Sequence, residues 1–242
     1  MTATVDKKRA PFPIEFYRSA VGKKWIMALT GIAIILFVVA HMIGNWKIFF
    51  PDVDGIPEID LYGEALRSLF FPIMPEQVVL WIMRTGLIVV FALHIHAAYS
   101  LTIMNRRARN EAYQGPRKYL AANYASRTMR VSGTIFLFFL LFHLSDLTWG
   151  RQPAAPVGWD RGEIYANFVA SFSRAPVTAF YVIAMGLLAF HLYHGAWSMF
   201  QSLGMNNPRF NRWRQGFAIG LAVVVFVGNA IMPLAVLFGI VS

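Results

Sequence analysis

The chain of 242 residues is 57% hydrophobic, contains no cysteine and carries a formal net charge of +10. A typical soluble domain is about 45–50% apolar, so this composition indicates a membrane protein. The lack of cysteine excludes disulfides, cysteine-bound zinc and any iron–sulfur cluster bound by thiolates of this chain. Histidine is therefore the main candidate metal ligand.

The first 24 residues are polar and basic, and no short apolar core followed by a cleavage site occurs in them. We interpret residues 1–24 as an N-terminal tail and residues 25–242 as one transmembrane domain. Five segments of this domain each supply the roughly 20 apolar residues that a helix needs to cross the hydrocarbon. They are approximately residues 25–48, 78–103, 130–149, 177–201 and 216–241.

Backbone groups in lipid must be satisfied within their own segment, so each span is expected to be helical. The predicted fold class is an all-α integral membrane bundle of five transmembrane helices. A further amphipathic segment, 61–75, is predicted to form a short helix on the outer surface.

The charges of the connections predict the orientation of the bundle. Most of the 22 Lys and Arg residues lie in the N-terminal tail and in the connections between spans two and three and between spans four and five. By the positive-inside rule, these connections and the N-terminus face the cytoplasm. The positive charge is thereby explained by topology, and nucleic-acid binding is not expected.

All six histidines fall inside predicted spans, where a polar side chain is rare and usually functional. At about 1.5 Å rise per residue, His41 and His143 lie on the outer side of the span midpoints. His94 and His194 lie on the cytoplasmic side, because spans two and four run in the opposite direction. Four helices thus contribute two layers of two histidines, and each layer can supply both axial ligands of one haem iron.

Alternatives remain within this pattern. A single histidine in a membrane helix can simply bond a neighbouring helix. His96 is two residues from His94 and points away from it, so both cannot bind the same haem, whereas His191 and His194 share one face and either is a candidate. A histidine beside a ligand can also bond a propionate or a quinone.

Few other polar groups occupy the spans. Arg84 lies near the outer interface, and Asp146 follows His143 on the same helix face, where it can orient a ligand, receive a quinol proton or cap the helix. Glu64 lies in the amphipathic outer segment. The basic side chains expected at the cytoplasmic mouth suit haem propionates or anionic lipid, and they are Lys23, Lys24, Arg127 and Arg130.

Four stretches, HMIGNW at 41–46, ALHIHAAYSLTIMNRRAR at 92–109, TMRVSGTIFLFFLLFHLSD at 128–146 and FHLYHGAWSMFQSLGMN at 190–206, carry a resemblance over nearly the whole chain. The sequence resembles the single-chain, five-helix, di-haem cytochrome b anchor of succinate dehydrogenases and some fumarate reductases. The resemblance implies that His94 and His194 bind a proximal haem b and that His41 and His143 bind a distal one.

The resemblance also implies partners and a reaction. A flavoprotein subunit with FAD and an iron–sulfur subunit are expected on the cytoplasmic face, with a possible higher oligomer of complexes. Electrons from succinate would pass through two b haems to a membrane quinone, with menaquinone the expected type. Candidate quinone contacts are Asp146, Glu64 and Arg84 near the distal haem and Ser19, Lys23 and Lys24 near the proximal one.

Two rival functions are considered. The di-haem anchor of a formate dehydrogenase or hydrogenase would use the same ligand logic with a different partner. A transporter or proton channel with a histidine relay would bind no haem. We expect the protein in the bacterial cytoplasmic membrane. Some fumarate-reducing members have a carboxylate in the fourth helix, and none is present in this span, so that proton route is not expected.

Overall fold

The computed structural model describes residues 11–108, 124–205 and 207–242, with side chains described from residue 129 onward in the second range. Five long apolar helices run through it, which confirms the predicted all-α membrane bundle. They are α2 (Ala20–Asn45), α4 (Val78–Arg107), α5 (Tyr124–His143), α7 (Ala175–Ser202) and α8 (Asn211–Leu237).

Three short helices and three short helical turns complete the described part of the chain. The helices are α1 (Phe12–Arg18), α3 (Glu58–Arg67) and α6 (Ile164–Phe172). The turns are η1 (Trp46–Phe49) after α2, the π-helical η2 (Leu144–Thr148) after α5, and η3 (Pro208–Phe210) before α8.

The first spanning helix begins earlier than predicted. Ser19 forms its N-cap, because the Ser19 hydroxyl accepts a hydrogen bond from the Gly22 amide at 2.9 Å. Apolar length alone placed the start at residue 25, after two lysines that the helix includes in its first turns. The outer segment predicted at 61–75 is helical only as α3, over Glu58–Arg67.

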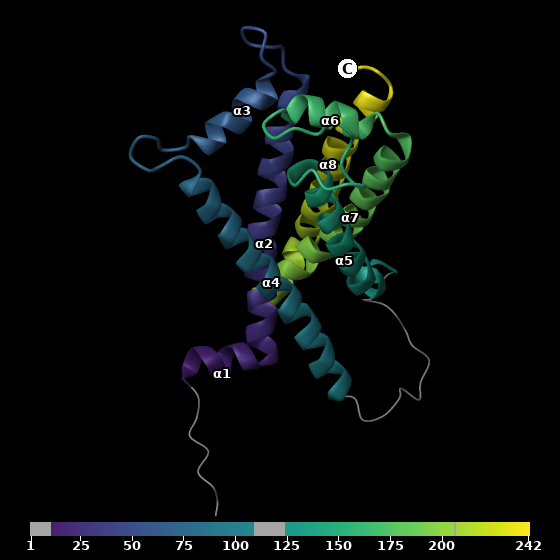
Figure 1. Cartoon of the computed structure of the whole chain (residues 1–242). Coiled ribbons are helices and arrows are strands. Elements are labelled where there is room, and N and C mark those ends of the chain that lie inside the picture. The colour runs from purple at the N-terminus through teal and green to yellow at the C-terminus, as the bar shows by residue number, and fades with distance from the viewer. Residues whose placement is uncertain (1–10, 109–123, 206) are drawn as a thin grey trace, which may run out of the picture.

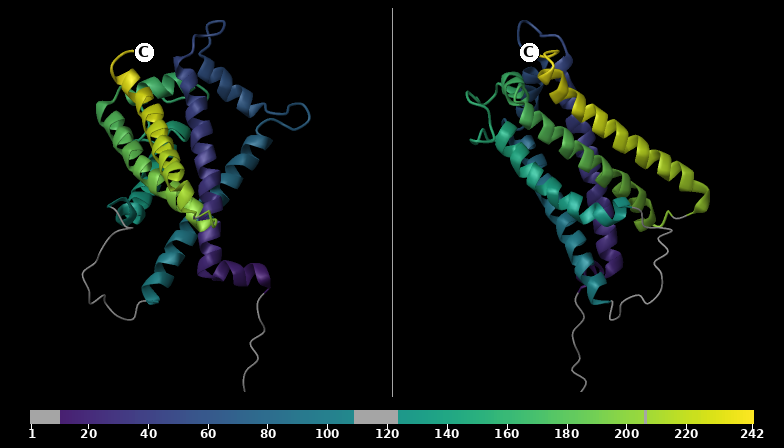
Figure 2. Two further views of the ribbon diagram at one scale, coloured as in Figure 1. Left: turned by 180° about the vertical axis from the view of Figure 1, so that it is seen from behind. Right: turned by 90° about the vertical axis from the view of Figure 1, so that its right-hand side faces the viewer.

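The bundle is arranged as two groups of helices that share α2. In one group α5 packs against α7 and α7 against α8; in the other α4 packs mainly against α2, which itself contacts α7 and α8. Figures 1 and 2 show α4 diverging from the α7–α8 pair, so the two groups open away from each other. This opening separates α4 from α5 and α7, which also carry histidines.

Each end of the bundle has its own short helices. At the bottom of Figure 1, α1 turns sharply away from the start of α2, and we refer to this as the α1 end. At the top, α3, α6 and the C-terminus lie together, and this is the α3 end. The N-terminal half of α7 and the C-terminal half of α8 bring much of the buried core toward the α3 end, including Tyr181 and Met232, and Phe172 of α6 packs with them.

Close helix contact fixes α2 against α8. The Trp46 indole donates a hydrogen bond to the Gly228 carbonyl at 2.8 Å. A Cβ at Gly228 would lie 2.3 Å from the Met42 sulfur, so only glycine allows this approach without movement of the methionine. Small residues permit such contacts between membrane helices. The position of His41, one residue before Met42, is thereby fixed in the bundle.

Candidate functional site

His41 on α2 and His143 at the end of α5 meet near the α3 end. Their ring centroids are 5.9 Å apart, and the two ring planes are perpendicular. Phe37 stacks on His41 at 5.3 Å and Phe139 stacks on His143 at 5.9 Å, which limits the rotation of both imidazoles. We refer to His41 and His143 as the α3-side pair.

Toward the α1 end, a cavity of about 390 Å³ lies between the α2–α4 and α5–α7 helices. His94, His191 and His194 all line it. Its walls toward the α3 end are apolar and reach Val38 and Leu140, each one turn from a histidine of the α3-side pair. A set of polar residues lies at the other end of its lining, comprising Thr102, Asn105, Arg130, Ser198 and Ser202.

His94 has a hydroxyl partner that fixes its tautomer. The Thr30 hydroxyl donates its one proton to the Ile26 carbonyl at 2.6 Å, and it lies 3.0 Å from Nδ1 of His94. A hydroxyl whose proton is already donated can only accept a second bond. Nδ1 of His94 therefore carries the proton, and Nε2 keeps its free lone pair.

His191 is held in the same way from α5. The Ser132 hydroxyl donates to the Met129 carbonyl at 3.1 Å and lies 3.4 Å from Nδ1 of His191. A glycine follows each hydroxyl residue: an added Cβ would lie 3.5 Å from Cε1 of His94 at Gly31 and 3.2 Å from Cε1 of His191 at Gly133. Both glycines lie directly beside an imidazole, and a side chain at Gly133 would crowd His191.

These contacts reveal a repeat that the sequence analysis missed. Segments 30–41 (TGIAIILFVVAH) and 132–143 (SGTIFLFFLLFH) both begin with a hydroxyl residue and glycine and end in a histidine of the α3-side pair. In α2 the Thr30 hydroxyl contacts His94 of α4, and in α5 the Ser132 hydroxyl contacts His191 of α7. Helices α2 and α4 therefore correspond to α5 and α7, and His94 corresponds to His191.

The two remaining histidines differ from this pattern. Nδ1 of His194 is buried with no hydrogen-bond partner among the described residues. His96 does not line the cavity; its Nδ1 is hydrogen-bonded to the Tyr17 hydroxyl, and the two rings stack with centroids 5.7 Å apart. His96 thus links α4 to α1.

Two of the predicted contacts at the α1 end have structural partners. The Ser19 hydroxyl donates to the Phe16 carbonyl at 2.7 Å, and the Lys23 ammonium donates to the Tyr17 carbonyl at 3.1 Å and lies over the Tyr17 ring. Lys24 is exposed and does not line the cavity.

Of the proposed propionate partners, Arg130 alone lines the cavity among the described side chains. The side chain of Arg127 lies outside the described residues.

At the α3 end, the predicted polar residues are separated. Glu64 forms an exposed ion pair with Arg67 at 3.0 Å, and Arg84 lies over the Trp81 ring. Asp146 is fully buried and forms an ion pair with Arg174 at 2.9 Å. It therefore does more than cap the helix end.

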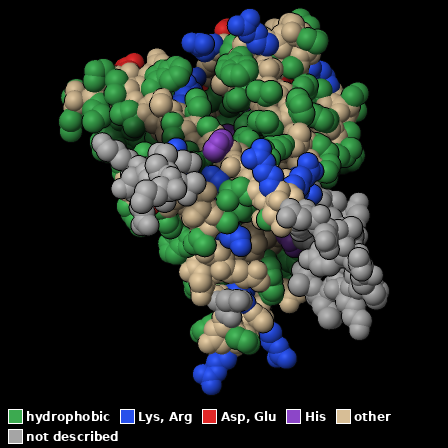
Figure 3. Space-filling model, turned by 90° about the horizontal axis from the view of Figure 1, so that it is seen from below, with side chains coloured by type: hydrophobic (Ala, Val, Ile, Leu, Met, Phe, Trp, Pro, Cys, Tyr) green, Lys and Arg blue, Asp and Glu red, His purple; other side chains and the backbone are tan. Residues whose placement is uncertain are grey.

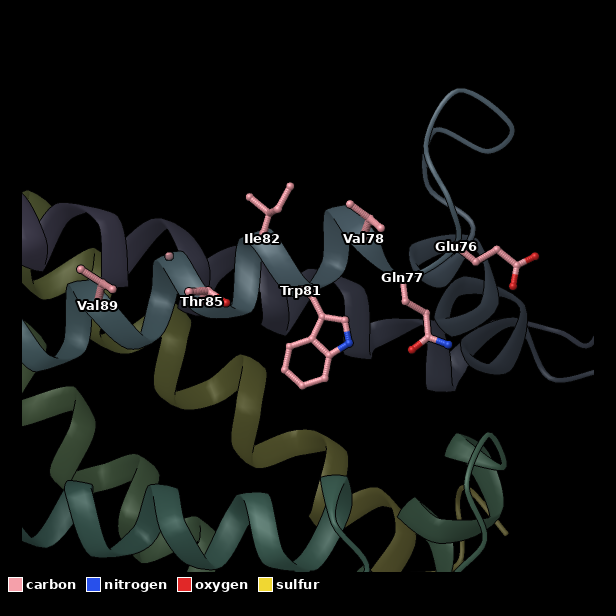
Figure 4. Close-up of a pocket in the computed structure, with 8 residues that line it drawn as sticks. Glu76, Gln77, Val78, Trp81, Ile82, Thr85 and Val89 are labelled. Carbon is pink, nitrogen blue, oxygen red and sulfur yellow. The ribbon is translucent and has the colours of Figure 1, made fainter.

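A second hollow, of about 800 Å³, lies along α4 and the residues just before it. Val78 and Ile82 project from α4 away from the neighbouring helices, and Trp81 projects from the opposite side (Figure 4). The described lining comes from α4 and its approach alone and contains no histidine. We interpret this hollow as part of the lipid-facing surface.

The cavity has the lining that one haem group would need, and the α3-side pair has the separation that two ligands of a second haem would need. Two imidazoles that bind one metal ion from opposite sides have ring centres about 6 Å apart, because each metal–nitrogen bond is about 2.0 Å. The α3-side pair has this separation. The cavity offers apolar walls, a polar mouth with a cation, and imidazoles with free Nε2 atoms, which suit an apolar macrocycle with carboxylate substituents.

The fold defines a multi-pass helical membrane protein with histidine side chains between its helices. The comparison with protein families gives a match over residues 104–230, to the succinate dehydrogenase/fumarate reductase transmembrane subunit. The chain belongs to this family. It is therefore a membrane subunit of an oxidoreductase complex and associates with the other subunits of that complex. The comparisons with curated proteins and with solved structures gave no match.

Proposed function

We propose that the chain is the di-haem cytochrome b anchor of a succinate:quinone oxidoreductase in a bacterial cytoplasmic membrane. The observation that carries the proposal is the placement of histidines from α2, α4, α5 and α7 in two layers between the helix groups. When bound, two b haems would carry single electrons between an iron–sulfur subunit and a membrane quinone. If two histidines held each haem, no open position would remain for oxygen.

His41 and His143 are the proposed ligands of the distal haem. Their rings come from separate helices and are restrained by stacked phenylalanines. Rigid, helix-borne ligands would suit electron transfer, because they would hold a haem with little rearrangement of the protein. The positions of the two rings support the pairing predicted from the sequence.

His94 is the proposed first ligand of the proximal haem, and its partner is His191 or His194. The family resemblance favours His194. Metal-bound histidines almost always donate their second ring N–H to a fixed acceptor, and His191 has this bond to Ser132. The correspondence between α4 and α7 also pairs His94 with His191. We therefore propose His191 as the ligand and keep His194 as the alternative for experiment.

The charge distribution supports a cytoplasmic α1 end. Lys and Arg side chains gather over the face seen from below in Figure 3, and histidine side chains are visible among them. By the positive-inside rule this face contacts the cytoplasm. It is the proposed docking face for the iron–sulfur subunit, with the flavoprotein subunit beyond it. Arg130 lines the cavity at this end and is the proposed partner of a haem propionate.

The structure restricts the candidate quinone contacts less than it restricts the candidate haem ligands. Ser19 and Lys23 are already bonded within the α1–α2 corner, and Glu64 is paired with Arg67. Lys24 and Arg84 have no hydrogen-bond or ion-pair partner among the described residues, so they are free to meet a headgroup. We keep Lys24 and Arg84 as candidate contacts for menaquinone or a related quinone.

A haem count on the purified complex tests the proposed function. We expect a pyridine haemochrome of b type with two haems per chain, and a b-type α-band after dithionite reduction. A colourless complex that still contains this chain would overturn the proposal and favour a histidine relay. Co-purification with a flavoprotein and an iron–sulfur protein would separate this function from the anchors of formate dehydrogenases and hydrogenases.

A further inference from the structure

The buried carboxylate of Asp146 is the centre of a hydrogen-bond network beside the α3-side pair. Asp146 lies in the π-helical turn η2 and is 0% exposed. The Ser171 hydroxyl lies 2.7 Å from both carboxylate oxygens, the Arg174 guanidinium donates to one of them at 2.9 Å, and the Tyr181 hydroxyl donates to the other at 2.9 Å. Three elements, η2, α6 and α7, therefore converge on one carboxylate.

The network continues from Tyr181 to His143. The Tyr181 oxygen lies 3.3 Å from Nδ1 of His143. Tyr181 is itself buried, and its ring packs edge-on against Phe139 and Phe172 with centroids 5.0 and 4.7 Å away. The hydroxyl is thus held between the carboxylate and the imidazole and has little freedom to turn elsewhere.

The two charged groups fix the direction of every hydrogen bond in the network. A guanidinium can only donate and a carboxylate can only accept. Tyr181 has one hydroxyl proton, and it goes to Asp146. The oxygen of Tyr181 can then only accept from His143, so Nδ1 of His143 carries its proton and Nε2 keeps its lone pair.

The far side of the network holds the carboxylate in place. Arg174 also donates to the Ser171 hydroxyl at 2.9 Å and to the Ser171 carbonyl at 3.2 Å. Arg174 and Ser171 border the α6–α7 turn, so this turn is tied to the end of α5. π-helical turns within α-helices are frequent at functional sites, and this one directs Asp146 toward α6 and α7.

We propose that Asp146 and Tyr181 are positioning residues that fix the tautomer and orientation of His143, so that its Nε2 is the atom presented to iron. This inference rests on the proposed function, and it assigns Asp146 to the support of the distal ligand instead of quinone binding. Outer partners of metal-bound histidine usually contribute about 10- to 100-fold to metal affinity.

Two substitutions separate an effect on the His143 tautomer from an effect on side-chain packing. Tyr181→Phe keeps the ring and removes the acceptor of the His143 proton. Asp146→Asn supplies an amide that can donate to Tyr181, which lets the tyrosine hydroxyl donate to His143 and favours the wrong tautomer. Tyr165→Phe is the matched control, because the Tyr165 hydroxyl bonds the Ser242 carbonyl at the same end of the bundle.

The experiment measures haem per chain and the midpoint potentials of both b components in the intact complex. We expect Tyr181→Phe to shift one potential and leave the other unchanged. We expect Asp146→Asn to weaken retention of that same haem about 10- to 100-fold, with Asp146→Glu recovering part of it. Tyr165→Phe should match the wild type.

Three results have different meanings. Potentials and haem content in both network variants equal to those of Tyr165→Phe would overturn the inference. Loss of both b components in Tyr181→Phe would show a general structural role and would also overturn it. A wild-type complex without any b-type spectrum would instead refute the proposed function itself.

Discussion

The imidazole rings of His41 on α2 and His143 on α5 lie edge to face, with their centroids 5.9 Å apart and their planes at 90°. The two residues are far apart in the sequence and come from different helices. Each ring is stacked on a phenylalanine one turn earlier in its own helix. The pair therefore depends on both helices being held at the same height.

Replacing either member of the α3-side pair should have the same effect. His41→Ala and His143→Ala would each remove one of the two ligands proposed for the distal haem, and we expect haem content to fall from about two to about one per chain. The double variant should lose no more than either single variant, since both act at one site. Pyridine haemochrome analysis of the purified complex measures this directly.

His96→Ala is the matched control for these variants, because His96 bonds Tyr17 and lies outside the cavity. It should keep both haems. A double variant that loses both haems, with each single variant losing one, would mean that His41 and His143 serve different sites.

The cavity gives a second prediction, which distinguishes His191 from His194. We expect His191→Ala to lose the proximal haem, because its tautomer is fixed by Ser132 and it corresponds to His94 in the repeat. His194→Ala should keep two haems per chain, with at most a shift in the proximal potential. Haem content together with a potentiometric titration checks both variants, and the reverse result would assign the ligand to His194.

The sequence alone was sufficient for the five spans and for the two histidine layers. Long apolar runs give a strong signal, and the fixed rise of a helix converts residue number into depth. The contact of His41 with His143 and the cavity that His94 and His194 share with His191 agree with these heights.

Other features depend on the tertiary structure and could not be read from a pattern. Helices α1 and α6 are 7 and 9 residues long, too short for a clear period. The partners of Asp146 come from α6 and α7, so the network exists only after the chain has folded. The hydroxyl–glycine repeat was visible in the sequence, but its meaning required the contacts with His94 and His191.

Gly44 provides a prediction for stability that is separate from the haem sites. A Cβ at Gly44 would lie 2.7 to 2.9 Å from the far end of the Tyr62 side chain, so either this side chain or α3 would have to move. We expect Gly44→Ala to destabilise the protein by about 1–3 kcal/mol, as other overpacked sites do. The thermal unfolding temperature of the complex in detergent should fall.

Gly86→Ala is the control for this change, because a Cβ at Gly86 has no neighbour within 4 Å. It should leave the unfolding temperature unchanged or raise it slightly, since alanine favours the helix. Equal unfolding temperatures for Gly44→Ala and the wild type would show that α3 is not fixed against α2 at this point.

The final prediction concerns the hydroxyls that hold the proximal histidines. Thr30→Val has nearly the same shape as the wild type but removes the acceptor for Nδ1 of His94, and Ser132→Ala does the same for His191. Each leaves a ring N–H without its partner in a buried setting, which costs about 1–3 kcal/mol. We expect each variant to shift the potential of the proximal b component and to weaken its retention, and to leave the distal one unchanged. Thr134→Val removes a hydroxyl that lines the cavity and bonds Tyr99 instead of a histidine, so it should change neither potential. If Thr30→Val and Thr134→Val gave the same potentials, the hydroxyl of Thr30 would have no part in holding His94.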